Sequence, residues 1–136
     1  MIKIIYGLKG TGKTKRILDM ANDSLNSATG SIVFIDDDNS YMFDLKNSIR
    51  FINAMEFGIQ GPKMFNGFLC GIAAQDFDIE CIFIDGFLRI VKHSIDSLKE
   101  MFAFLADFTE KTHINIVMSV SGDPTIAPDF IKPYII

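Results

Sequence analysis

An eight-residue segment near the start of the sequence has the composition of a phosphate-binding loop. Residues 7–14 read GLKGTGKT and satisfy the pattern G-x-x-x-x-G-K-[ST]. Glycine adopts positive φ without a steric penalty, which allows successive backbone N–H groups to face a phosphate. In this pattern Lys13 neutralises phosphate charge during binding and catalysis, and the Thr14 hydroxyl reaches Mg²⁺. The residues predicted to hold the phosphates are Gly7, Lys9, Gly10, Thr11, Gly12, Lys13, Thr14 and Lys15.

A carboxylate follows a later apolar run at the point where a strand would end. Ile82-Phe83-Ile84 leads into Asp85, and ligands of parallel α/β sheets bind outside the carboxyl ends of the strands. Asp85 is therefore predicted to hold Mg²⁺ together with Thr14. The alternative is an ordinary turn acid, because Asp-Gly is also a turn signal. Gly86 stands where many nucleotide hydrolases carry a catalytic glutamate, so a base that activates water is expected elsewhere.

Short apolar runs alternate with helical patterns, which predicts an α/β fold with a mostly parallel sheet. The expected strands cover residues 2–6, 31–35, 49–53, 81–84 and 114–120. The expected helices run over 13–25, from Gly61-Pro62 onward, and over 94–111. Gly67 and Gly71 lie one turn apart on the second helix, which predicts close packing against the sheet. Residues 134–136 are a candidate edge strand. The phosphate-binding pattern thus follows a strand and opens a helix, the context that favours it over a plain glycine-rich turn.

The arrangement resembles the RecA/DnaB branch of the P-loop NTPases. Phe34-Ile35-Asp36-Asp37-Asp38 is similar to the RecA strand that ends near the catalytic glutamate, and the resemblance places the catalytic role on Asp38, with Asp37 as a competitor. Three solvated loop carboxylates are the alternative. The strand ending at Ser119 and Ser121 is similar to one that carries a γ-phosphate sensor. The resemblance implies a three-layer α/β/α fold, strand order 3-2-4-5-1, and ATP and Mg²⁺ as cofactors.

The chain also resembles small bacterial ATP-binding proteins that are sometimes labelled after the twitching-motility ATPase PilT. With two histidines, His93 and His113, it lacks the His-rich boxes of such ATPases, so no motility role is carried over. The leading hypothesis is a slow Mg·ATP hydrolase that needs a protein partner or self-assembly, with Arg89 available to a neighbouring subunit or to bound nucleotide. The alternative is a nucleotide-dependent binding module that does not hydrolyse. A small-molecule or nucleotide kinase is a third reading, disfavoured by the presence of only three arginines.

Composition predicts one domain spanning residues 1–136 in a cytoplasmic protein. A net charge of −4 argues against nucleic-acid binding by bulk charge. The two cysteines, Cys70 and Cys81, are too few for a disulfide scaffold. Neither a signal peptide nor an apolar run of about 18 residues is present, so membrane insertion is not expected.

Overall fold

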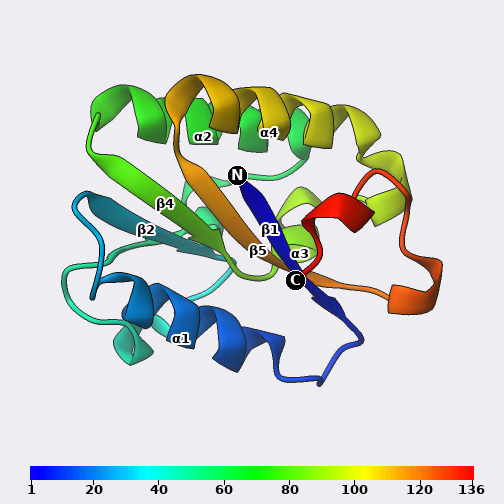
Figure 1. Cartoon of the computed structure of the whole chain (residues 1–136), viewed down its shortest axis with the longest axis horizontal. Helices are drawn as coiled ribbons and strands as arrows, with labels where there is room; N and C mark the ends of the chain where they lie inside the picture. The colour runs from blue at the N-terminus through cyan, green and yellow to red at the C-terminus, as the bar shows by residue number, and fades with distance from the viewer.

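A five-stranded, all-parallel sheet forms the centre of the molecule (Figure 1). The computed structural model describes all residues, 1–136. The order across the sheet is β1-β5-β4-β2-β3, which is 3-2-4-5-1 when read from the β3 edge. The strands are β1 (Ile2–Gly7), β2 (Ser31–Asp36), β3 (Arg50–Asn53), β4 (Ile79–Ile84) and β5 (Asn115–Ser121). The predicted α/β class and parallel sheet are confirmed.

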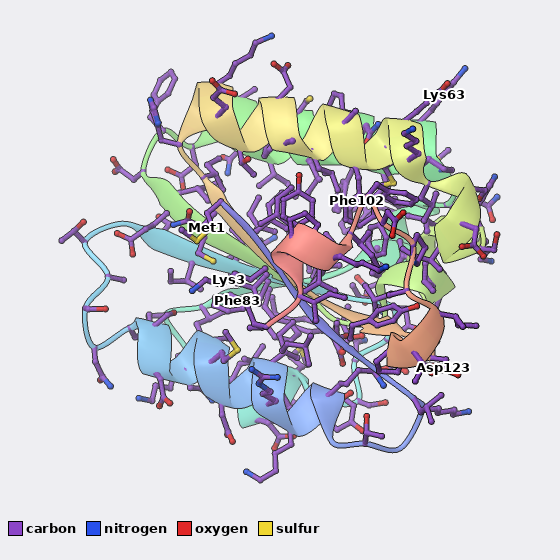
Figure 2. All side chains as sticks on the ribbon, turned by 45° about the vertical axis from the view of Figure 1, so that its right-hand side comes forward. Met1, Lys3, Lys63, Phe83, Phe102 and Asp123 are labelled. Atoms are coloured by element: carbon purple, nitrogen blue, oxygen red, sulfur yellow. The ribbon has the colours of Figure 1, made fainter.

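Helices cover both faces of the sheet (Figure 1). Helix α1 (Lys13–Ser24) lies on one face, and α2 (Pro62–Gln75) and α4 (Lys99–Thr112) lie on the other. Side chains alternate along each strand, so neighbouring residues such as Ile82 and Phe83 enter different layers. The core on the α2 and α4 side has 26 buried residues and that on the α1 side has 11. Figure 2 shows Phe102 in the larger layer and Phe83 in the smaller one.

The expected helix over 94–111 is interrupted at its start. Residues Ile95–Ser97 form one 3₁₀ turn, and α4 begins only at Lys99. Leu98 between them has φ −102° and ψ 18°, outside the α-helical region, and its side chain is buried. An additional helix, α3 (Phe87–Val91), directly follows the Asp85-Gly86 turn. Its five residues are too few to produce a helical period in the sequence.

Two other expectations were wrong in detail. Gly67 and Gly71 are exposed, and a Cβ placed on either would meet no atom within 4 Å, so they are not close-packing positions. The last residues do not form a strand: Lys132–Tyr134 is a 3₁₀ turn. A single parallel bridge joins Ile135 to Ile4, and the N–H of Ile136 donates to the Ile4 carbonyl at 3.0 Å. None of the helices has the length and apolar character that a membrane crossing requires.

Candidate functional site

The glycine-rich loop lies at the carboxyl end of β1 and leads directly into α1. Gly10 and Gly12 have φ of 81° and 82°, the left-handed conformation that glycine favours. Two side chains fasten the loop to one carbonyl: Thr11 Oγ1 donates to Leu8 O at 2.7 Å, and Lys13 Nζ donates to the same oxygen at 2.8 Å. No acidic residue occupies the first turn of α1, and no side chain caps its N-terminus. The backbone N–H groups there are available to an anion.

Thr14 and Asp85 meet at the centre of the site, although they lie 71 residues apart in the sequence. Thr14 Oγ1 donates to Asp85 Oδ2 at 3.0 Å. The other carboxylate oxygen accepts a hydrogen bond from the Ser119 hydroxyl, and that hydroxyl oxygen accepts from the Gly86 N–H at 3.2 Å. Asp85 is only 2% exposed. The ends of β4 and β5 and the start of α1 therefore position one buried carboxylate.

The hydroxyl and carboxylate at this point fit Mg²⁺. Both Thr14 and Asp85 offer hard oxygen donors, which Mg²⁺ prefers, and Mg²⁺ commonly takes one or two protein ligands beside substrate phosphates. No sulfur or imidazole group lies among the residues that line the surrounding cavity. A hard divalent cation such as Mg²⁺ suits this set of oxygen donors.

The first of the three consecutive aspartates is buried. Asp36 is 1% exposed; its Oδ1 accepts from the Asp37 N–H at 2.8 Å, and its Oδ2 has no hydrogen-bond partner. Burial, followed by the neighbouring Asp37 and Asp85 carboxylates, raises the pKa of Asp36 to about 8. Asp36 therefore holds a proton at neutral pH.

The next aspartate binds an arginine of the same chain. Arg89, on α3, donates to Asp37 from Nε at 2.8 Å and from Nη2 at 3.1 Å, a bidentate ion pair. Burial alone would raise the pKa of Asp37, but the hydrogen bonds and the charge of Arg89 outweigh burial and hold the pKa below its usual value. Oxygen atoms of residues 36–38 lie within 4.8 Å of one another. The guanidinium already engages both oxygens of the middle carboxylate, so the cation at this cluster is Arg89.

Asp38, the predicted catalytic residue, is exposed at the rim of the site. Its Oδ1 accepts from the Ser40 N–H at 2.9 Å, which closes a local turn. The carboxylate is thus held by its own loop, although Asp38 also lines the cavity at the strand ends. Asp37, the competing candidate for the base, is engaged by Arg89.

The glycine-rich loop and the residues around Thr14 and Asp85 line a cavity of about 440 Å³ at the carboxyl ends of the strands. This volume falls within the roughly 300 to 1,000 Å³ typical of small-molecule sites. Seven of the predicted site residues line it: Lys9, Gly10, Gly12, Lys13, Thr14, Asp38 and Asp85. The other lining residues are Ser40, Tyr41, Gly86, Phe87, Leu88, Arg89, Ser119 and Ser121.

Three predicted residues do not line the cavity. Gly7 is buried, and a Cβ there would lie 3.0 Å from Thr11 Oγ1. The Thr11 hydroxyl is used within the loop, where it donates to the Leu8 carbonyl. Lys15 extends along the exposed face of α1, where its Nζ lies 2.9 Å from Asp19. The i, i+4 spacing of this pair is a signal that the sequence already contained.

Positive charge is concentrated in the cavity of an otherwise acidic protein. Lys9, Lys13 and Arg89 all line it. Desolvation lowers the pKa of Lys13, Asp85 opposes this effect, and the charge of Arg89 adds to it. Cationic side chains that face one space favour an anionic ligand there.

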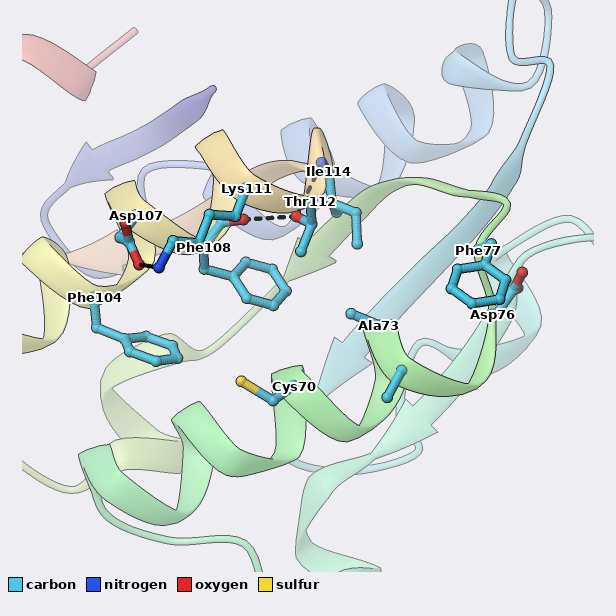
Figure 3. Close-up of a pocket in the computed structure, with 11 residues that line it drawn as sticks. Cys70, Ala73, Asp76, Phe77, Phe104, Asp107, Phe108, Lys111, Thr112 and Ile114 are labelled. Atoms are coloured by element: carbon cyan, nitrogen blue, oxygen red, sulfur yellow. Dashed lines mark hydrogen bonds and ion pairs between the residues drawn. The ribbon is translucent and has the colours of Figure 1, made fainter.

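A second cavity of about 590 Å³ lies between α2 and α4 (Figure 3). Its lining includes Phe104, Phe108, Ile114 and Phe77, and the last of these is 99% exposed. Phe77 and Ile114 precede β4 and β5, so this cavity lies at the amino ends of the strands. It is separate from the cavity beside the glycine-rich loop, and the two cavities share no lining residue.

Comparison with known proteins adds no assignment: no protein-family model and no curated protein sequence matches this chain.

Proposed function

We propose that this protein binds a Mg²⁺·nucleoside triphosphate, ATP in the first place, in the cavity beside the glycine-rich loop. The observation that carries the proposal is the 3.0 Å hydrogen bond between Thr14 and Asp85 beside the Lys13 side chain. It joins the hydroxyl that ends the G-x-x-x-x-G-K-[ST] pattern to a strand-end carboxylate, which is the pair of oxygens expected at Mg²⁺ in a P-loop NTPase.

The chain's own residues divide the work of binding. The loop amides and the start of α1 hold phosphate oxygens, and Lys13 leaves the Leu8 carbonyl to neutralise their charge. Thr14 and Asp85 hold Mg²⁺, which supplies charge neutralisation to the phosphates when bound. Ser119 keeps the Asp85 carboxylate oriented through its hydroxyl. Each of these residues lines the cavity or holds one that does.

Slow ATP hydrolysis is the proposed activity, because both candidates for the base already have a partner: Asp37 is paired with Arg89, and Asp38 accepts from the Ser40 N–H. Asp38 remains the proposed residue that orients water, but the Ser40 N–H holds its side chain. The residue that follows Asp85 is Gly86, which has no side chain that could act as a base. A protein partner or self-assembly that rearranges the residue 38–40 loop would raise the rate.

The hydrogen bond between Asp38 and the Ser40 N–H also favours a second candidate function, a nucleotide-dependent binding module that does not hydrolyse ATP. If Asp38 keeps its hydrogen bond to the Ser40 N–H when ATP is bound, it does not orient water and ATP is not hydrolysed. The presence or absence of bound ATP would then be what a partner protein responds to. Phosphate release measured over a range of protein concentrations separates the two proposals. Activity per subunit that rises with concentration supports the assembling ATPase, and complete absence of turnover at every concentration supports the binding module.

Calorimetric titration with Mg²⁺ and a non-hydrolysable ATP analogue tests binding itself. Lys13→Ala is expected to weaken affinity at least tenfold, because a hydrogen bond to a charged group contributes about 1.5–3 kcal/mol. Lys15→Ala is the matched control: it removes the same charge two residues away, from a side chain paired with Asp19. Equal effects of the two variants, or no binding by the native protein, would refute the proposal.

A further inference from the structure

The ion pair between Arg89 and Asp37 lies at the wall of the nucleotide cavity. Its two residues are 52 positions apart and come from different elements, the first turn of α3 and the loop after β2. The Arg89 side chain is 59% exposed and that of Asp37 is 18% exposed. One partner is therefore fixed in the fold, whereas the other lies largely in solvent at the cavity it lines.

The turn before α3 leaves room for this guanidinium. Gly86 has φ of 67°, and a Cβ built on it would lie 2.5 Å from Arg89 Nη2 and 2.9 Å from Cζ. A residue with a side chain at this position would displace the Arg89 head group. The absence of a glutamate after Asp85 thus has a structural counterpart: the space that its side chain would enter is occupied by Arg89.

Arg89 also faces the same space as the phosphate-loop lysine. Both side chains line the cavity, and the charge of one opposes protonation of the other. A terminal phosphate placed at Lys13 would bring its negative charge toward Arg89 as well. The planar guanidinium, which now makes two parallel hydrogen bonds to a carboxylate, makes the same kind of bidentate contact to phosphate.

We propose that Arg89 exchanges its carboxylate partner, Asp37, for the terminal phosphate of a bound nucleoside triphosphate, so that this ion pair distinguishes triphosphate from diphosphate. The inference rests on the proposed nucleotide site and adds an intramolecular γ-phosphate contact to it. Exchange is favourable because the terminal phosphate carries more negative charge than one carboxylate and accepts the same bidentate hydrogen bonds. The Arg89 side chain, 59% exposed, also gives up little burial when it leaves Asp37.

The test compares ADP with a non-hydrolysable ATP analogue, both with Mg²⁺, by calorimetric titration of four proteins: native, Arg89→Ala, Asp37→Asn and the double variant. Arg89→Ala is expected to weaken binding of the triphosphate at least tenfold while ADP affinity changes less than threefold. Asp37→Asn keeps the shape of the side chain but removes the charge that holds Arg89, so triphosphate affinity should rise by about fivefold or more. That gain should vanish in the double variant.

Arg89→Lys keeps the positive charge but cannot make the two parallel hydrogen bonds of a guanidinium. It is expected to retain only part of the preference for triphosphate that Arg89→Ala loses. Circular dichroism and thermal melting verify that each variant is folded. Equal loss of ADP and triphosphate affinity in Arg89→Ala, or no loss of either, would overturn the exchange while leaving the nucleotide site intact. If native protein and Lys13→Ala both bind neither ligand, the site itself fails, and the exchange fails with it.

Discussion

The buried carboxyl of Asp36 makes the stability of this protein depend on pH in an unusual direction. The pKa of Asp36 is raised from 3.8 to about 8, first by burial and then by the neighbouring carboxylates. Between these values the folded state holds a proton that the unfolded state has released. Stability is therefore highest below pH 4 as far as this group is concerned, and it declines as pH rises toward 8.

The size of the effect follows from the two pKa values. Each pH unit between 3.8 and about 8 lowers the free energy of unfolding by about 1.36 kcal/mol, so the whole interval amounts to roughly 6 kcal/mol. The pKa of Asp37 is lowered in the folded state, so its stabilising contribution is complete above its usual pKa. The contribution of Asp37 therefore does not offset the fall in the free energy of unfolding between pH 5 and pH 8.

Asp36→Asn removes the ionisation and keeps the side-chain size. Urea unfolding in Mg²⁺-free buffer from pH 5 to pH 9 is expected to show a falling midpoint for the native protein and a nearly constant one for the variant. The variant should be the more stable protein at pH 8. Asp38→Asn is the control: it removes an exposed carboxylate two residues away and leaves Asp36 in place, so the decline should persist. A native midpoint that stays level or rises from pH 5 to pH 8 would refute the reasoning.

Two further substitutions test how the site is held together. Gly86→Ala and Gly58→Ala both place a side chain at left-handed backbone, φ 67° and 63°, which costs about 1–2 kcal/mol. Only Gly86→Ala also displaces Arg89, so urea unfolding should show the larger loss there; a larger loss for Gly58→Ala would contradict the packing described above. Ser119→Ala leaves both Asp85 and the Gly86 N–H without their partner, so thermal melting should show a destabilisation of about 1–3 kcal/mol. A melting temperature equal to that of the native protein would show that this hydroxyl does not support the carboxylate.

The α/β class and the parallel sheet could be predicted because the signals are local. Ile32–Ile35 and Ile82–Ile84 are apolar throughout, as strands covered on both faces must be, and turn residues bound them. The glycine-rich loop is likewise contiguous, so its pattern is visible without any tertiary information. Helix α3 was missed because five residues are fewer than the roughly 11 to 18 over which a helical period can be recognised.

The acidic part of the site depended on tertiary contacts that no local pattern contains. Three consecutive aspartates look alike in the sequence, but β2 extends through Asp36 and buries it, while Asp38 lies beyond the strand and is exposed. Which of them is buried depends on where the strand ends, and strand ends are the least predictable part of an element. The pairing of Asp37 with Arg89 spans 52 residues and follows only from the placement of β2 beside β4.

The contact between the final residues and β1 has a consequence for how copies of this chain meet. An open strand edge presents unpaired backbone groups to which another strand can add, a common route to aggregation. Here the bridge from Ile135 and the hydrogen bond from the Ile136 N–H occupy the β1 edge at Ile4. The opposite edge, β3, has only four residues and carries the exposed Arg50. Neither border favours a continuous intermolecular sheet, so ordered self-association would have to use helix or loop surfaces.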